Sequence, residues 1–561
     1  MNRQFLMKIV SQVATAPFLV GTSLFLCALS FYSFAVLKID YRKTALLDLG
    51  PHPDATEYFA QAKALLKDRW PSIQIGYDKL PSRYPIGYPA LMLPWLKILP
   101  EADSILAPFR TNQAIGLLLV LAVFGFYTYL AMPVTGGLAA LLLATLPGFF
   151  TFCRSSMSEI STSTLFVLAF MFAYLGLEEE RRWKIYLSAI FLGLSLNIRV
   201  QSLFFAPLLL AMALFPIREA PLRWFLHCAA VLIVFALAAS PVLALNTIQF
   251  HSPFKTGYGF WVPYFYEVSG AQFRKPLLFF LHYVPTNAAF LWREFSLAPQ
   301  GFTTANIFGT GTSFVAAFAL LICAGLCFVR LSRFVTCAFL AGLSFLAATA
   351  GSSPADGRFY LPLLILSVAV VVLPVTWAAK SLVAGKRVVA ALAIFSLVVA
   401  ACLGYPSRSG YKTFEINRSQ AWAALHFTVP PRQSAQFVAQ RHFLETFSGQ
   451  PGIVLSDIDP VYLNALLPEA FIAAPLDGKH QYRWSRIWRY DRPQAVALVK
   501  RGLDQSLPIY ALFVSQKDRE EKASRLPELD GYRWAILDTS VSDKVAVLKL
   551  TPVAADDGMP F

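Results

Sequence analysis

The stretch "PDATEYFAQAKALL", Pro53 to Leu66, places two carboxylates and a tyrosine just beyond a long apolar segment of the chain. Asp54 follows a proline and precedes Glu57 by three positions, which is the spacing of a capping box at the start of a helix. On that helix Asp54, Glu57 and Tyr58 share one face, and Phe59 lies on another. The stretch therefore predicts an amphipathic helix. Two roles stay open for its carboxylates, capping the helix or carrying chemistry.

The composition of the chain is that of an integral membrane protein. Of the 561 residues, 56% are hydrophobic and only 14% are charged, as in proteins that span a bilayer. Residues 1–404 carry +13 of the formal net charge of +15, which suits anionic lipid headgroups and gives no indication of a nucleic-acid partner. All seven cysteines lie within or beside apolar segments, so neither a disulfide framework nor a thiolate metal site is predicted.

Eleven apolar segments approach or reach the roughly 20 residues that a membrane span requires. The N-terminus "MNRQFLMKIV" is basic and lacks a convincing cleavage site, which predicts a retained first helix. Placing it in the cytoplasm puts all the short basic loops, such as "EEERRWK" and "RLSR", on the same side. The predicted spans cover about residues 14–37, 106–130, 133–152, 162–177, 184–197, 200–216, 223–244, 308–329, 334–351, 360–379 and 388–404.

This topology places loops 38–105 and 245–307 and the C-terminal part outside the membrane. The apolar segment "YPALMLPWLKILP", Tyr88 to Pro100, is short and broken by proline, so we expect an interfacial helix there and not a further span.

The chain divides by composition into a transmembrane domain, residues 1–404, and a soluble domain, residues 405–561. In the soluble part the runs "PGIVLSD", "FIAAPL", "IYALFVSQ", "YRWAILD" and "KVAVLKL" predict strands, and they alternate with helical patterns such as "RPQAVALVKRGL". The predicted fold class is a polytopic α-helical membrane protein of about 11 transmembrane helices with a small extracytoplasmic α/β domain at its C-terminus.

Several charged residues are predicted to gather at the outer membrane face, where charge is costly and usually functional. Glu159 lies in the turn "RSSMSEIS", five residues after Arg154. Arg199 interrupts an apolar run, and Arg358 opens a late span in "DGRFYLPLL". Each of them alone is also explained as a snorkelling anchor.

The motifs of residues 1 to about 404, taken in order, resemble membrane glycosyltransferases of the GT-C fold, above all bacterial relatives of protein mannosyltransferases and of aminoarabinose transferases. The resemblance rests on "DATEYFAQAKAL" followed by "RYPIGYPALMLPW", on "SE" in the second outer loop, and on "NIRVQSLFFAPLLL", "NTIQFHSPFKTGYGF" and "RFYLP". The chain departs from the family at Ala55, where many relatives have a second acidic residue, and at Phe359, where tyrosine is common. The identity of a second carboxylate therefore stays open between Glu57 and Glu159.

The resemblance implies that a sugar moves from a polyprenyl-phosphate donor to an acceptor hydroxyl at the outer face of the bacterial inner membrane. The acceptor is a lipid, a glycan or a protein. The attacking hydroxyl needs a base, for which Asp54 is the first candidate, with Glu57 and Glu159 as the other catalytic carboxylates. Three roles remain open for Glu159: orienting the acceptor, binding a divalent metal ion, or pairing with Arg154. No other cofactor is implied.

The departing polyprenyl phosphate needs cations that stabilise its charge. Arg199 and Arg358 are the first candidates, because a guanidinium group can bind phosphate oxygens bidentately. Arg83 and Arg154 are the second candidates. Tyr58 and Tyr84 are candidates for stacking on a sugar, although aromatic residues at this depth also anchor proteins at the interface.

Two other classes of function are alternatives to sugar transfer. A transporter or flippase of lipid or glycan would be expected to have interrupted helices, inverted symmetry and ionisable groups near the middle of the membrane. A noncatalytic scaffold with an outer sensing domain is the second alternative. The large outer loops and the polar residues predicted at one face favour the enzyme.

Overall fold

The computed structural model describes residues 16–41, 53–205, 220–261, 451–467, 471–478, 488–538 and 546–553, with a few isolated positions besides. These residues belong to two compact units. The first unit takes residues 1–39, 109–242 and 273–429, and the second takes residues 40–108, 243–272 and 430–561. Each unit is described by itself.

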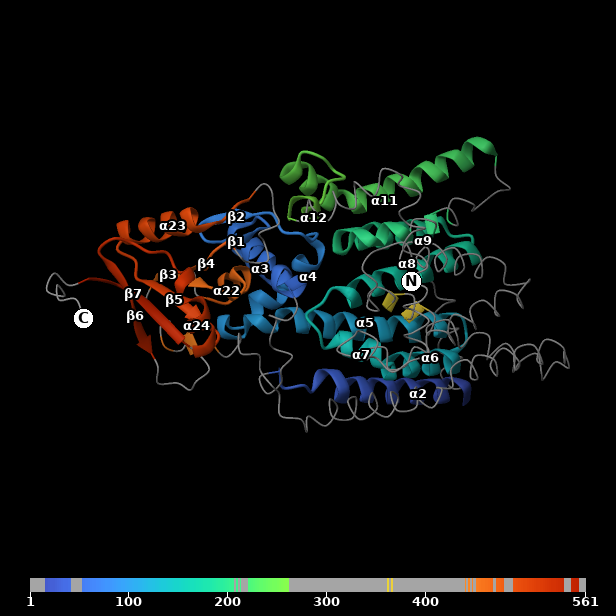
Figure 1. Cartoon of the computed structure of the whole chain (residues 1–561). Helices are drawn as coiled ribbons and strands as arrows, with labels where there is room; N and C mark the ends of the chain where they lie inside the picture. The colour runs from blue at the N-terminus through green and yellow to red at the C-terminus, as the bar shows by residue number, and fades with distance from the viewer. Residues whose placement is uncertain are drawn as a thin grey trace, which may run out of the picture. The chain divides into compact units, whose positions relative to one another are not determined.

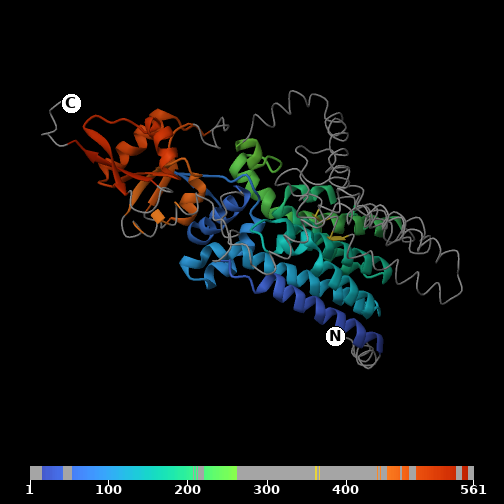
Figure 2. The same cartoon turned by 60° about the horizontal axis from the view of Figure 1, so that its bottom comes forward.

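The described part of the first unit is helical, and its long helices run side by side (Figure 1, Figure 2). Helix α2 continues into a short π-helix, Ser33–Leu37. The helices are α2 (Ala16–Tyr32), α5 (Ala107–Tyr129), α6 (Pro133–Thr145), α7 (Pro147–Cys153), α8 (Glu159–Glu178), α9 (Arg182–Ile198), the 3-10 helix Val200–Phe205, and α11 (Pro221–Phe250), whose last turns belong to the second unit.

Small residues let these helices approach closely. A Cβ atom on Gly137 of α6 would overlap the backbone of Gly21 in α2, and one on Gly21 would overlap the backbone at Pro133. Gly193 of α9 meets the carbonyl group of Phe235 in α11 in the same way. Close contact between small residues is how helices associate in a membrane, where burial of apolar side chains provides little net driving force.

Four described helical segments are long and apolar enough to span a membrane, and they match four of the predicted spans. They are Ala16–Leu37, Glu101–Tyr129, Glu159–Glu178 and Pro221–Phe250. The predicted spans at 133–152 and 184–197 correspond to α6 with α7 and to α9. The segment 200–216 is described only in part, and the four spans predicted after residue 308 lie outside the described residues. The total of about 11 spans therefore stays a prediction.

The second unit contains the first predicted outer loop. The stretch that begins at Pro53 forms helix α3 (Pro53–Asp68), as its pattern predicts. A hairpin of strands β1 (Ile73–Ile75) and β2 (Asp78–Leu80) follows, and Gly76 takes a positive φ of 60° in its turn. The loop continues with α4 (Gly87–Ile98), which is too short to span a bilayer, and the unit also contains α12 (Gly257–Trp261).

The C-terminal part of this unit is a five-stranded mixed sheet with the strand order β4-β3-β5-β7-β6 (Figure 1). Strand β3 pairs in parallel with β4 and β5, whereas β7 pairs antiparallel with β5 and β6. All five strands fall on the runs predicted from the sequence. The elements are β3 (Gly452–Ser456), α22 (Pro460–Leu466), β4 (Phe471–Pro475), α23 (Arg492–Asp504), β5 (Ile509–Phe513), α24 (Gln516–Lys522), β6 (Tyr532–Asp538) and β7 (Ala546–Pro552).

The central strands β3 and β5 lie in the buried core around the sheet. Every residue of β3 and of β5 is buried, as expected for parallel strands covered on both faces. Ile453 and Ile509 belong to an apolar cluster that also includes Val499 from α23. Tyr77, from the tip of the β1–β2 hairpin, packs against the same cluster.

The hairpin is bound to the C-terminal sheet by specific hydrogen bonds. The Gly76 amide donates to the Ala473 carbonyl oxygen over 2.8 Å. The Asn464 side chain of α22 donates to the carbonyl oxygens of Gln74 (2.9 Å) and Ala473 (2.8 Å) and accepts from the Ala473 amide (2.7 Å). At the start of β2, next to the turn, the Trp488 indole donates to Asp78 over 2.9 Å. Residues almost 400 positions apart in the chain thus form one structure.

We predict that Asn464→Ala weakens this junction. The substitution removes three hydrogen bonds and leaves backbone groups of Gln74 and Ala473 without that partner, at a cost of about 1–3 kcal/mol for an unsatisfied buried group. Thermal unfolding of the purified protein in detergent measures the effect. Lys500→Ala, at an exposed position of α23, is the control and should leave the transition unchanged. Equal transitions for the two variants would contradict this account of the junction.

Candidate functional site

A buried ion pair lies between helix α3 and the segment that follows the hairpin, in the predicted outer loop 38–105. The Glu57 side chain is fully buried, and it pairs with Arg83, whose side chain is 18% exposed. The carboxylate accepts from the Arg83 Nε at 2.5 Å, from the Arg83 backbone amide at 3.0 Å and from the Ser82 hydroxyl at 2.8 Å. Glu57 therefore ties α3 to residues 82–83, through contacts that its spacing from Asp54 does not predict.

Asp54 lies one turn earlier on α3 and is partly exposed. Its Oδ1 accepts a short hydrogen bond from the Tyr84 hydroxyl. Burial, with Tyr258 and Asp54 nearby, raises the pKa of Tyr84 well above its usual value, so the phenol stays protonated and acts as a donor to the carboxylate. Tyr84 in turn packs on Tyr58, with ring centroids 4.8 Å apart. The aromatic rings hold the hydroxyl group on Asp54.

A carboxylate of the C-terminal part, Asp459, is influenced electrostatically by Glu57 and Arg83. Asp459 precedes α22, and its side chain accepts from the Val461 amide at 2.9 Å, as a helix N-cap does. Burial above all, together with the negative charge of Glu57, raises the pKa of Asp459 to about 6, although the helix amides and Arg83 act in the opposite direction. Asp459 thus lies within electrostatic reach of the Glu57–Arg83 pair and changes charge near neutral pH.

The first unit holds a second buried ion pair. Glu159 opens α8, and Arg199 directly follows α9. Arg199 Nη1 and Glu159 Oε1 are 2.5 Å apart, and the two side chains are 10% and 2% exposed. The Arg154 Nε donates to the carbonyl oxygen of Ala35 at 2.6 Å, and its guanidinium lies over the Phe150 ring. The pairing of Glu159 with Arg199, 40 residues later, was not among the roles that the sequence suggested for Glu159.

The predicted site residues thus fall into two groups. One group lies in the second unit and comprises Asp54, Glu57, Tyr58, Arg83 and Tyr84. The other lies in the first unit and comprises Arg154, Glu159 and Arg199. Arg358 lies outside the described residues. Among the residues that the structure describes, no three histidine, cysteine or carboxylate side chains meet in a way that could hold a metal ion.

Sequence reasoning missed Ser82 and Asp459. Ser82 lies beside Arg83 in a predicted loop motif and had no distinguishing signal. Asp459 stands directly before Pro460, and nothing in the sequence connected it with residues 57 and 83.

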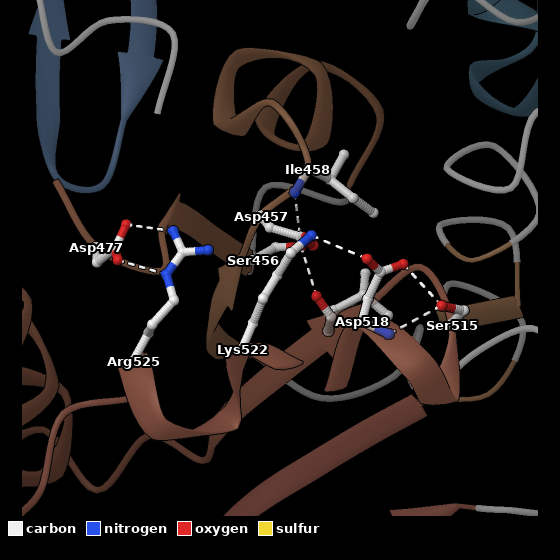
Figure 3. A network of polar contacts seen from close by, with 9 residues as sticks. Ser456, Asp457, Ile458, Asp477, Ser515, Asp518, Lys522 and Arg525 are labelled. Carbon is white, nitrogen blue, oxygen red and sulfur yellow. Dashed lines mark hydrogen bonds and ion pairs between the residues drawn. The ribbon is translucent and has the colours of Figure 1, made fainter. Parts of the chain in front are cut away.

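A network of ion pairs covers the carboxyl edge of the parallel strands β4, β3 and β5, where ligands bind in many open α/β sheets. Lys522 forms a salt bridge of 2.5 Å with Asp457, which lies just after β3, and another of 2.9 Å with Asp518 (Figure 3). Arg525 makes two bonds of 2.5 Å to Asp477, which follows β4 (Figure 3). Both cations are therefore engaged by carboxylates of the domain itself, and we assign no ligand to this edge.

Comparison with known proteins identifies the fold. No protein-family model matches the chain, and no curated protein sequence matches it. ArnT from Cupriavidus metallidurans, an aminoarabinose transferase solved with bound undecaprenyl phosphate, superposes with a TM-score of 0.55 and 13% identity over 95% of this chain and 98% of that one. Its apo form gives a TM-score of 0.56 at 12% identity, over 94% and 97% of the two chains.

The oligosaccharyltransferase of Archaeoglobus fulgidus, in its apo form, superposes with a TM-score of 0.52 and 13% identity over 96% of this chain and 75% of that one. Both proteins are membrane glycosyltransferases of the GT-C fold. The chain therefore has the GT-C fold, as the sequence motifs indicated.

We predict that Arg83→Ala destabilises the protein far more than loss of a surface charge does. It leaves the Glu57 carboxylate buried without its cation, at a cost of about 3–5 kcal/mol. The double variant Arg83→Ala/Glu57→Gln removes the charge as well and should recover much of that loss. Lys63→Ala, which breaks a pair with the 82% exposed Glu101, should cost about 0–1 kcal/mol. Thermal unfolding in detergent compares the three, and equal losses would exclude a buried pair.

Proposed function

We propose that the chain is a membrane glycosyltransferase that moves a sugar from a polyprenyl-phosphate-linked donor to an acceptor hydroxyl. In this proposal the reaction takes place at the outer face of the bacterial inner membrane, and the C-terminal domain is extracytoplasmic. The observation that carries the proposal is the Asp54 carboxylate, partly exposed and held by Tyr84 on the first outer loop of a chain with the GT-C fold. The ligands in two of the similar structures, undecaprenyl phosphate and dolichol-phosphate, belong to the proposed donor class.

Asp54 is the proposed general base. It accepts the proton of the acceptor hydroxyl as that oxygen attacks the anomeric carbon. The Tyr84 hydroxyl fixes the carboxylate orientation. Glu57 is a weaker candidate for the same role, because it is fully buried and already binds Ser82 and Arg83. We therefore assign Glu57 to holding the loop and not to proton transfer.

Arg199 is the proposed partner of the donor phosphate. Its ion pair with Glu159 fixes the guanidinium before the donor arrives, and such preorganised cations stabilise the charge that develops on a leaving phosphate. Glu159 then orients Arg199. We retain Arg358 as a second proposed phosphate ligand. Only the sequence resemblance supports this assignment.

Asp54→Asn separates the catalytic role from a structural one. Asparagine caps helices about as well as aspartate, and its side-chain oxygen still accepts from Tyr84, so the variant should fold and insert normally. It cannot accept the proton as a carboxylate does, and we expect turnover to fall on the order of 10²-fold or more. The assay is release of undecaprenyl phosphate from a panel of undecaprenyl-phosphate-linked hexoses and pentoses.

The matched control is Asp68→Asn on the same helix, where the carboxylate pairs with the 54% exposed Lys79. It should leave turnover unchanged. A fully active Asp54→Asn enzyme would exclude Asp54 as the base.

Replacement of Arg199 should weaken binding of undecaprenyl phosphate. Loss of one buried charge-assisted contact costs about 2–5 kcal/mol, which Arg199→Ala should show in a binding titration with the purified protein. Arg199→Lys retains a cation for Glu159 but loses bidentate geometry, so it should fold and bind the lipid with intermediate affinity. Lys63→Ala is the control. Equal affinities for all three variants would reject Arg199 as the phosphate ligand.

A further inference from the structure

The stretch "NTIQFHSPFKTGYGFW", residues 246–261, is a motif of the sequence to which the proposed function gives no role. It begins in the last turns of α11 and ends with the short helix α12 (Figure 1). The Asn246 side chain donates to the Pro253 carbonyl oxygen at 3.2 Å, and the Gln249 side chain donates to the Pro71 carbonyl oxygen, also at 3.2 Å. These bonds direct the chain from α11 toward the hairpin that follows α3.

Gly257 brings α12 into direct contact with the backbone of residues 81–84. A Cβ atom on Gly257 would overlap the Ser82 carbonyl oxygen and would lie 2.7 Å from the Cα atom of Arg83. Both atoms belong to the backbone, which cannot rotate away as the end of a side chain can. Gly259, two residues later in the same helix, has open space at its Cβ position. Close packing therefore requires glycine at 257 but not at 259.

Trp261 gives α12 a second contact with the same segment. Its indole Nε1 donates to the Pro81 carbonyl oxygen at 2.6 Å, and the residue is buried. Trp488, from the C-terminal part, packs against Trp261 with ring centroids 6.0 Å apart and also donates to Asp78 of β2. Helix α12 is thus held both by the end of the hairpin and by the C-terminal part.

Tyr258 carries this contact to the residue that bonds the proposed base. Its ring meets the Tyr84 ring at an angle of 84°, with centroids 5.5 Å apart, which is the favoured edge-to-face arrangement of an aromatic pair. Tyr84 also packs on Tyr58 of α3, and its hydroxyl donates to Asp54. The Tyr84 ring therefore has aromatic neighbours from both α3 and α12.

We propose that α12 is a positioning element for the transfer site: through Tyr258 it holds the Tyr84 ring, so that the Tyr84 hydroxyl stays on Asp54. Gly257 and Trp261 fix α12 where it can do so. This inference rests on the proposed function, in which Asp54 is the base. A base acts only within hydrogen-bond reach of the proton that it accepts, so α12 affects turnover through the alignment of the carboxylate and not through contact with the substrate.

The two glycines of α12 provide a matched test. Gly257→Ala places a methyl group against the backbone at Ser82 and should displace α12 from residues 81–84. We expect turnover to fall on the order of 10-fold to 10²-fold, because small misplacements of a catalytic group are costly. Gly259→Ala makes the same chemical change in open space and should leave turnover unchanged. Equal turnover of the two variants, measured as release of undecaprenyl phosphate from the donor panel, would overturn the proposal.

Hydrogen exchange measures the same contact without activity. The Arg83 amide donates to Glu57, and the Tyr84 amide donates to the Ser82 hydroxyl, so exchange at these amides reports how firmly the segment is held. Peptides that cover residues 81–84 should exchange faster in Gly257→Ala than in Gly259→Ala, while peptides from β3 and β5 exchange alike in both. Equal exchange at residues 81–84 would contradict the proposal.

Replacement of Tyr258 leaves the backbone contact in place, and it provides the test if Gly257→Ala does not fold. Tyr258 is half-buried, and Tyr258→Ala removes the ring that packs on Tyr84. We expect kcat to fall about tenfold, whereas the affinity for undecaprenyl phosphate, which we assign to Arg199, stays the same. Tyr258→Phe retains the ring and should recover most of the rate. A loss of lipid affinity as large as the loss of kcat would mean that Tyr258 binds the donor, and would overturn its positioning role.

A double-mutant cycle tests the path through Tyr84. Tyr84→Phe removes the hydroxyl group that bonds Asp54 but keeps the ring. Since Tyr258 acts through that hydroxyl in this proposal, Tyr84→Phe/Tyr258→Ala should be no slower than the slower of the two single variants. A purely structural role of Tyr258 would instead multiply the two effects, and that result would exclude the path through Tyr84.

These results separate the inference from the proposed function. A wild-type protein that releases no undecaprenyl phosphate from any donor of the panel refutes the proposed function, and the inference with it. An active wild type whose Gly257→Ala and Gly259→Ala variants turn over equally refutes the inference alone.

Discussion

The buried ion pair between Glu57 and Arg83 is the interaction on which the segment from α3 to Tyr84 depends. A fully buried carboxylate is tolerated only when cations and hydrogen-bond donors surround it. Arg83 supplies the cation and a backbone amide, and Ser82 supplies a hydroxyl. Because this pair fixes residues 82–83 against α3, it also places the next residue, Tyr84, where its hydroxyl reaches Asp54. The geometry of the proposed base thus follows from a neighbouring pair to which we assign a structural role.

The C-terminal sheet provides the support for that segment. Hydrogen bonds from Gly76, Asn464 and Trp488 join the hairpin to the sheet, and Tyr77 enters the apolar cluster of the sheet. A two-stranded hairpin of this length is only marginally stable alone. Packing on a larger sheet makes it rigid, and a rigid support is what a catalytic group needs in order to stay in a productive position.

Local patterns in the sequence predicted the local structure well. The helix from Pro53, the five C-terminal strands and four apolar spans each follow from a short-range signal, namely a capping pattern, a β-rich run or a long apolar segment. The interaction partners of the charged residues could not be predicted from such local signals. The spacing of Asp54 and Glu57 suggested a capping box, whereas Glu57 binds Ser82 and Arg83, 25 and 26 residues away in the chain. The pairing of Glu159 with Arg199 and the approach of Asp459 to Glu57 depend on how helices and domains pack, and no local pattern records such packing.

A cryo-electron microscopy structure of the full chain with undecaprenyl phosphate would test the central claim most directly, that this fold binds a lipid phosphate for sugar transfer with Asp54 as the base. The account predicts density for the phosphate against the Arg199 guanidinium, with Asp54 facing the space that the sugar and acceptor would occupy. Phosphate density held by other groups, with the Asp54 carboxylate turned away from the bound lipid, would contradict it.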